Sequence, residues 1–279
     1  MTEARTPVET LTFTSELGVA KSKRKISSLL ILAFFSGVFL AFAAAGSTMA
    51  SQNLLANPDT FGLGRVLSGM IFASGLMMVV LTGAELFTGN TLILISVYER
   101  KATVKQMLFN WLMVYTGNLI GSIFIAWLMN LSGVFAVNNG LFGAMTIKIA
   151  ANKTSLLFHS AFILGIFCNW IVCTAIWVSF ASRDLSGKIL AIFFINSLFV
   201  MAGFEHSIAN MYIIPAGIFA AQYPQWAAMS QLSAQQLADL NWTNFFVRNL
   251  IPVTLGNIIG GGGMLWTLFW LALKNRTKF

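Results

Sequence analysis

Six apolar stretches, each long enough to cross a lipid bilayer, constrain the fold of this chain more than any other feature. They cover about residues 26–52, 66–97, 106–131, 155–181, 188–221 and 248–273. A transmembrane helix needs about 20 largely apolar residues. The composition agrees, because 57% of the 279 residues are hydrophobic and only 9% are charged, against roughly a quarter in soluble domains. The sequence therefore predicts an all-α integral membrane protein with six transmembrane helices.

The second and fifth stretches are too long for one straight helix, and each carries the same polar interruption near its middle. The first interruption is "GAELFTGN", Gly83 to Asn90, and the second is "GFEHSIAN", Gly203 to Asn210, so both read G-x-E-x-x-x-x-N. Glycines and small polar side chains let a membrane helix unwind and re-satisfy its freed backbone groups. We expect both helices to be broken, at Gly83, Glu85, Gly89, Asn90 and Gly203.

The first three stretches resemble the next three. Glu85 and Glu205 stand 120 residues apart, and "TGNLIG" at Thr116 is echoed by "LGNIIG" at Leu255. A repeat with an odd number of spans enters the membrane from the opposite side in its second copy, which gives inverted repeats. Transport proteins built in this way place their pathway at the repeat interface, with broken helices near the midplane. We therefore expect the two breaks to face each other.

The distribution of basic residues predicts the orientation. With a cytoplasmic N-terminus, 13 of the 17 Lys and Arg residues fall on the inner side, as the positive-inside rule requires, and both termini are cytoplasmic. This topology accounts for the net charge of +8 without a nucleic-acid partner. We divide the chain into a cytoplasmic amphipathic segment on the membrane surface (1–25), a six-helix transmembrane domain (26–273) and a cytoplasmic tail (274–279), and expect no cleaved signal peptide.

Three stretches carry a resemblance to a known family. "VLTGAELFTGN" (Val80 to Asn90) and "GIFCNWIVC" (Gly165 to Cys173) resemble the two signatures of the formate/nitrite transporter family, and "GFEHSIANM", from Gly203, resembles its central-histidine motif. The likeness covers essentially the whole chain and is closest to the formate-channel branch. It implies an aquaporin-like subunit, a homopentamer with one pore per subunit, a bacterial inner-membrane location and passage of small monovalent anions.

His206 is the strongest candidate for a role in transport. An ionisable group deep in a span is expensive, about 2.5–3.5 kcal/mol for a charge, and this one adjoins a glutamate and a helix break. We therefore favour a pore role over a satisfied core histidine. The resemblance implies that Thr88 is its partner and that Lys153, Asn169 and Glu205 support it. Lys153 otherwise reads as an anchor at a span end.

The remaining polar residues of the two breaks have structural alternatives. A buried carboxylate beside unwound backbone most cheaply accepts free N–H groups, which favours structural roles for Glu85 and Glu205. Two roles stay open for the amides, which either hydrogen-bond across helices or line the path; they are Asn90, Asn169 and Asn210.

Apolar side chains near the motifs are candidates for gates that exclude water and hydrated cations. The resemblance implies an inner constriction at Leu76 and Leu86 and an outer one at Phe72 and Phe199, and Phe87 belongs to the same set.

These features predict a channel for small monovalent anions, most of all formate. His206 would supply a proton or a hydrogen bond to a largely dehydrated anion. A nitrite or hydrosulfide channel of the same family, and a neutral-solute pore, are the alternatives. We expect no enzyme, cofactor or metal, since H-E-x-x-H, C-x-x-C and Walker-type motifs are absent. The expected partners are the anion, protons, membrane lipid and further copies of the chain. Residues 1–25 would gate the cytoplasmic side or form a collar for the oligomer.

Overall fold

Helices make up the whole of the regular structure in the computed structural model, which describes residues 4–275. The first half contains α1 (Pro7–Ser22), α2 (Ile26–Ala56), α3 (Phe61–Thr82), α4 (Phe87–Asn90), α5 (Ile93–Tyr98) and α6 (Val104–Leu131). The second contains α7 (Leu141–Thr154), α8 (Phe158–Ala181), α9 (Leu185–Ala202) and α10 (Ser207–Ala220). The last span runs from Trp242 to Leu273 through α13 (Trp242–Asn244), α14 (Ile251–Asn257) and α15 (Thr267–Leu273), joined by the wider π-helical turns Phe245–Leu250 and Ile258–Trp266.

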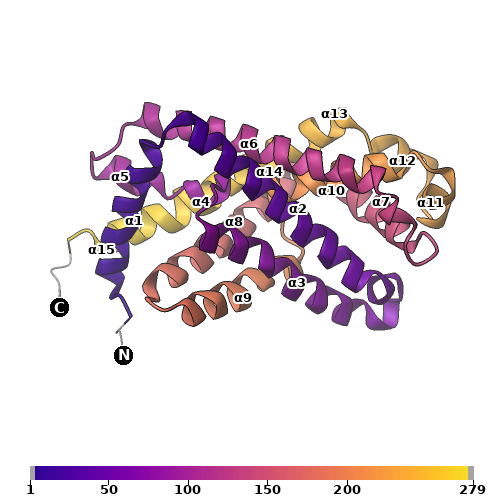
Figure 1. Cartoon of the computed structure of the whole chain (residues 1–279), viewed down its shortest axis with the longest axis horizontal. Helices are drawn as coiled ribbons and strands as arrows, with labels where there is room; N and C mark the ends of the chain where they lie inside the picture. The colour runs from indigo at the N-terminus through magenta and orange to yellow at the C-terminus, as the bar shows by residue number, and fades with distance from the viewer. Residues whose placement is uncertain (1–3, 276–279) are drawn as a thin grey trace.

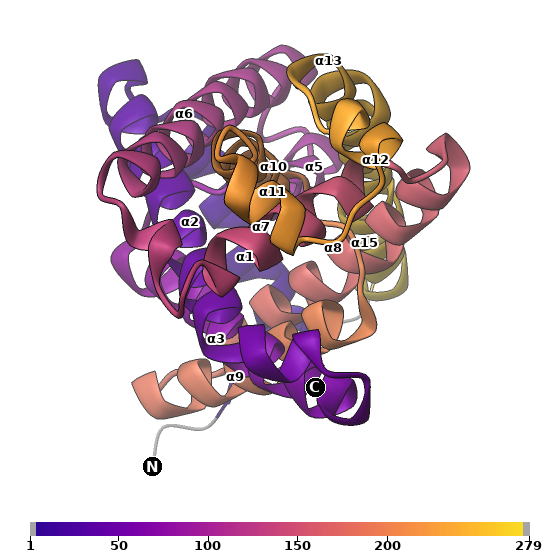
Figure 2. The same ribbon diagram turned by 90° about the vertical axis from the view of Figure 1, so that its right-hand side faces the viewer.

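Six helices within the described residues are long and apolar enough to cross a membrane, so the predicted six-span, all-α fold is confirmed and the chain is a multi-pass integral membrane protein. Figure 1 shows α1, α5 and α15 at one end of the bundle and α7, α11 (Pro224–Met229) and α12 (Ala234–Asp239) at the other. α10 lies inside the bundle, packed against α2, α6 and α7 (Figure 2). The predicted tail at 274–279 falls mostly outside the described residues.

The second and fifth spans are broken at matching places, as predicted. Gly83 follows the last residue of α3 with φ 75°, and Gly203 follows the last residue of α9 with φ 81°. This left-handed conformation costs other residues more than glycine. The next N–H in each half bonds back to the helix, Ala84 to Val79 O at 3.1 Å and Phe204 to Phe199 O at 2.9 Å.

Gly89 does not belong to the unwound segment. It lies inside α4, where a side chain would press on Ile176. Its role is close packing of α4 on α8, and the break in this span needs only Gly83 and the extended residues that follow it.

Glycines also bring the long helices into backbone contact. A side chain at Gly121 would collide with the carbonyl oxygen of Phe34, which joins α6 to α2. Gly260, in the second half, stands in the same relation to the carbonyl of Ile166 on α8. Small residues at such crossings are typical of membrane helix packing, so the repeated Gly-containing motifs of the third and sixth spans have a direct structural reason.

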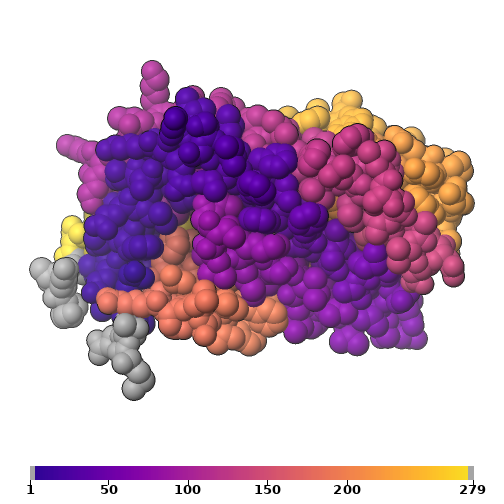
Figure 3. Space-filling view, in the orientation of Figure 1, coloured from indigo at the N-terminus to yellow at the C-terminus, as the bar shows by residue number. Residues whose placement is uncertain are grey.

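Two short helices depart from the sequence-based expectations. The helix α7, between the third and fourth spans, was not predicted. α1 is helical as expected, but it lies against α5 and α8 at the surface of the bundle (Figure 3). Its buried side consists mainly of small and polar residues, among them Thr14, Ser15 and Gly18, and Ser96 donates a hydrogen bond to Ser15 O at 2.7 Å. These contacts place its inner face against protein, which differs from the predicted apolar face on a membrane.

Candidate functional site

Thr88 and His206 meet between the two helix breaks. Thr88 Oγ1 and His206 Nε2 are 3.0 Å apart, and both side chains are buried. His206 is also the N-cap of α10, because its Nδ1 accepts the N–H of Ala209 at 3.1 Å. A neutral imidazole that accepts at Nδ1 carries its hydrogen on Nε2. The hydrogen-bond network therefore assigns Nε2 as a donor to Thr88, which leaves the threonine hydroxyl hydrogen free to donate elsewhere.

Asn118, on α6, fixes the unwound segment of the first break. Its amide nitrogen donates to Ala33 O at 2.8 Å and to Glu85 O at 2.9 Å, and its oxygen accepts the N–H of Phe87 at 3.0 Å. Glu85 N–H in turn donates to Leu32 O at 3.2 Å. The backbone groups that the missing helical turn would have paired thus find partners on α2 and α6, as the interior of a membrane requires.

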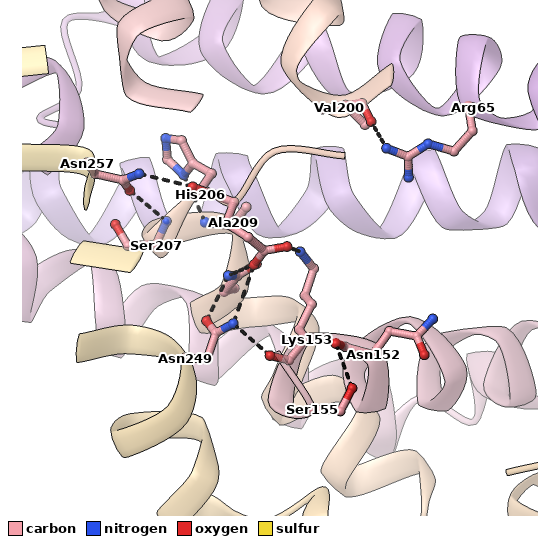
Figure 4. A network of polar contacts seen from close by, with 12 residues as sticks. Arg65, Asn152, Lys153, Ser155, Val200, His206, Ser207, Ala209, Asn249 and Asn257 are labelled. Carbon is pink, nitrogen blue, oxygen red and sulfur yellow. Dashed lines mark hydrogen bonds and ion pairs between the residues drawn. The ribbon is translucent and has the colours of Figure 1, made fainter. Parts of the chain in front are cut away.

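Asn257 does the same for the second break. It donates to Gly165 O at 2.8 Å and to Glu205 O at 3.0 Å, and it accepts the N–H of Ser207 at 2.9 Å (Figure 4). Neither asparagine was singled out as a site residue from sequence. The signal was present, because each is the Asn of the echoed "TGNLIG" and "LGNIIG" stretches.

Each motif glutamate is buried and paired with a lysine. Lys21 Nζ lies 2.7 Å from Glu85 Oε2, and Arg24 Nε lies 3.4 Å from Oε1 of the same carboxylate. Lys153 Nζ lies 2.7 Å from Glu205 Oε1. A paired and hydrogen-bonded carboxylate does not present a bare negative charge to an anion.

The motif asparagines complete these clusters. Asn90 donates to Glu85 at 2.6 Å and to Asn110 Oδ1 at 2.9 Å, and Asn110 donates to the backbone oxygen of Lys21 at 3.0 Å. This series of hydrogen bonds thus runs from α4 through α6 to α1. Asn110 was not identified from the sequence. The signal was an asparagine eight residues before Asn118, which recurs as Asn249 eight residues before Asn257.

The second half repeats this chain of bonds. Asn210 donates to Glu205 at 2.6 Å and to Asn249 Oδ1 at 2.8 Å, and Asn249 donates to Lys153 O at 3.1 Å (Figure 4). α7 therefore occupies in the second repeat the position that α1 occupies in the first, and Lys153 corresponds to Lys21.

Asn169 links the two breaks directly. Its amide nitrogen donates to Thr88 O at 3.2 Å and to Asn257 O at 2.7 Å. Cys173, one turn further along α8, has its sulfur 3.5 Å from the side chain of Thr91. Both amide hydrogens of Asn169 are thus used on backbone oxygens of other segments, which corresponds to bonding across helices, one of its two open roles.

Two cavities approach the Thr88–His206 pair from opposite ends. The α7-side cavity, of 340 Å³, is lined by Arg65, Phe72, Lys153, Phe199, Glu205 and His206, among others. The α1-side cavity, of 140 Å³, is lined among others by Lys21, Arg24, Leu76, Leu86 and Asn90. Basic residues thus line both cavities.

The apolar candidates divide between these cavities. Phe72 and Phe199 meet edge to face with ring centroids 5.5 Å apart, and the Phe199 ring lies 5.7 Å from that of His206. Leu76 and Leu86 line the α1-side cavity. Phe87 differs from the other four, because it packs against α6, with its ring 5.0 Å from Tyr115.

A bundle of inverted repeats with broken helices, and with basic cavities on both sides of a buried donor pair, defines a membrane transport protein. The profile of the formate/nitrite transporter family matches residues 8–271, and the chain belongs to that family. The resemblance drawn from the motifs is confirmed, as is the expectation that this is not an enzyme.

Relatives and solved structures agree with this assignment. The chain is 37% identical over 259 residues to the formate channel FocA of Escherichia coli K12, covering 92% of this chain and 90% of that protein. It is 33% identical over 280 residues to a probable formate transporter of Methanothermobacter thermautotrophicus, covering 95% and 96% of the two chains. A solved pentameric formate channel with formate bound superposes with a TM-score of 0.82 at 37% identity, covering 90% of this chain and 98% of that one.

Proposed function

We propose that this protein is a channel for formate and similar small monovalent anions. The path runs from the α7-side cavity past Phe72 and Phe199 to Thr88 and His206, and then past Leu76 and Leu86 to the α1-side cavity. The observation that carries the proposal is the buried contact between Thr88 and His206, with the ring of Phe199 beside that of His206 and with Leu86 two residues before Thr88. Relatives that bear the name formate channel support formate as the substrate.

Charge attracts the anion, and desolvation controls its passage. Lys148 and Lys153 line one cavity, and Lys21 and Arg24 line the other, so a carboxylate is drawn toward either entrance. Between the constrictions an unpaired anion would lose its hydration at high cost. A hydrogen bond from the central pair, or passage as the neutral acid, reduces that cost.

The N-cap bond of His206 favours hydrogen bonding over proton donation by the histidine. A protonated ring would carry hydrogen on Nδ1 and point it at the N–H of Ala209, so the cap bond at 3.1 Å would be lost. A neutral His206 keeps this bond and still orients Thr88, whose hydroxyl then donates to the passing anion.

We further propose that the protein is a homopentamer in a bacterial inner membrane with both termini cytoplasmic. The solved relative described as pentameric supports the assembly. α1 and α15 at the same end of the bundle support termini on one side (Figure 1). Exposed apolar side chains on the outer helices, such as Ile31, Leu112 and Phe194, suit contact with lipid or with neighbouring subunits. The division at residues 25 and 273 stays a prediction, and so does a gating or collar role for residues 1–25.

Flux of formate into proteoliposomes tests the function, with His206→Asn as the variant. The matched control is His159→Asn, which changes the other histidine of the chain, exposed near the start of α8. We expect saturable formate flux in the wild type and in His159→Asn, with nitrite and hydrosulfide as competitors, and reduced flux in His206→Asn. Passage of glycerol without formate would show a neutral-solute pore. Equal flux in all three proteins would show that His206 is structural.

A further inference from the structure

Arg65, on α3, reaches across to the end of α9. Its Nε donates to Met201 O at 3.2 Å, and its Nη2 donates to Val200 O (Figure 4). Both oxygens belong to the last turn of α9, where carbonyl groups lack the next helical turn as a partner. Val200 O also accepts the N–H of Gly203 at 3.1 Å, and a cation here complements the negative end of the helix dipole. One side chain of α3 therefore completes the end of the half-helix that leads into the second break.

The helices are closely packed around this contact. A side chain at Gly69, one turn after Arg65, would collide with Ser197 O on α9. A side chain at Gly203 would lie 3.2 Å from the Arg65 guanidinium. The guanidinium thus fills the space beside the left-handed glycine from which the chain turns toward His206.

The aromatic pair of the α7-side cavity lies next to this contact. Phe72 follows Arg65 by seven residues and so lies on the same face of α3. Its ring meets that of Phe199, and Phe199 directly precedes Val200. The same face of α3 therefore holds the last turn of α9 at two points, with a guanidinium on the backbone and a ring on the side chain.

The first break has no counterpart of this arginine. At the repeat offset of 120 residues, the position that corresponds to Arg65 is Leu185, an exposed apolar residue without a side-chain donor. The contact is therefore not required to form a break of this kind. It is a feature by which the α7-side constriction differs from the α1-side one.

We infer that Arg65 is a positioning residue for the α7-side constriction, holding the end of α9 so that Phe199 closes against Phe72 beside His206. This inference rests on the proposed channel function. Arg65 acts through Phe199, in contrast to a basic residue that only attracts anions into the cavity.

The test compares R65M with K148M, which removes a second basic side chain of the same cavity. Formate and acetate flux are measured in proteoliposomes, since acetate is the bulkier monocarboxylate. We expect R65M to raise the ratio of acetate to formate flux roughly tenfold, the scale of losing a charged hydrogen bond, with little change in KM for formate. K148M should instead raise KM and leave the ratio unchanged. If R65M behaves like K148M, the inference is overturned.

A double variant tests whether Arg65 acts through the ring. F199A alone should raise the acetate ratio, and adding R65M should then have no further effect, because contacting residues are not additive. Fully additive effects would overturn the inference. Should R65M not fold, R65K replaces it, since an ammonium group cannot bind both carbonyls as the guanidinium fork does. A wild-type ratio of acetate to formate flux in R65K would overturn the positioning role of Arg65. Absence of formate flux in the wild type would reject the channel function itself.

Discussion

Asn257 makes beside the second break the same three hydrogen bonds that Asn118 makes beside the first. Each donates to the backbone oxygen of a motif glutamate and to one carbonyl of the first span of its repeat. Each also accepts one N–H of the half-helix that follows the break. The inverted repeat thus extends to individual bonds. Each amide replaces the helical pairing that the break removes, which is why irregular backbone is tolerated at this depth.

Removing either amide should destabilise the protein. Asn118→Ala and Asn257→Ala each leave two buried backbone groups of the break without a partner, the oxygen of the motif glutamate and one N–H of the following half-helix. At about 1–3 kcal/mol for each group, a loss of at least about 2 kcal/mol is expected. Thermal unfolding in detergent measures it, together with formate flux. Asn53→Ala is the control, because Asn53 is exposed and bonds only at the surface, to Asn138. A melting temperature equal to that of the control would show that the breaks are held by other contacts.

The ion pair between Lys153 of α7 and Glu205 leads to a second prediction. Lys153→Met leaves Glu205 as a buried carboxylate without its cation, and breaking such a pair costs about 3–5 kcal/mol. Adding Glu205→Gln removes the charge and should restore part of the stability, because an amide keeps an acceptor oxygen for Asn210. The comparison is the unfolding temperature of the single and double variants. If the double variant is less stable than Lys153→Met alone, the carboxylate contributes through something other than its pairing.

Much of the site could be predicted because its chemistry is unusual for a membrane. Polar residues inside long apolar stretches are costly, so the two motifs and His206 stand out against their surroundings. The breaks at Gly83 and Gly203 follow from the same contrast. The repeat of Glu85 at Glu205 also indicated the inverted architecture, because each copy of the repeat contains three spans and an odd number reverses the direction of the second copy. Thr88 was named as the partner of His206 only through the family resemblance.

Other parts were hidden for physical reasons. α7 contains Lys148 and Lys153 and is too short to cross a bilayer, so hydropathy did not detect it. The sequence could not show whether an amide such as Asn118 bonds to backbone, side chain or substrate, since all are possible within a span. Phe87 directly precedes Thr88 in the sequence, yet its ring packs on α6. Only the fold decides which side of a short half-helix faces the cavity.

The two turn glycines should differ in how they tolerate alanine. Gly83→Ala introduces a side chain at φ 75° into open space, so it should cost only the left-handed strain of about 1–2 kcal/mol. Gly203→Ala adds crowding against Arg65 to the same strain and should cost more. Gly62→Ala, in an exposed helical position with open space around it, should be neutral or slightly stabilising. Equal unfolding temperatures for the first two variants would show that the guanidinium moves aside freely.

Thr88 offers the most direct test of the central hydrogen bond. Thr88→Val keeps the shape of the side chain and removes the hydroxyl, so His206 Nε2 loses its partner at 3.0 Å and the anion loses a donor. We expect formate flux to fall roughly tenfold, the scale of one buried hydrogen bond of about 1–2 kcal/mol. Thr88→Ser keeps the hydroxyl and should retain most of the flux. Stopped-flow uptake into proteoliposomes measures all three proteins. If serine reduces flux as much as valine or more, the hydroxyl alone does not sustain the flux, and the hydrogen bond between Thr88 and His206 is not what carries the anion past His206.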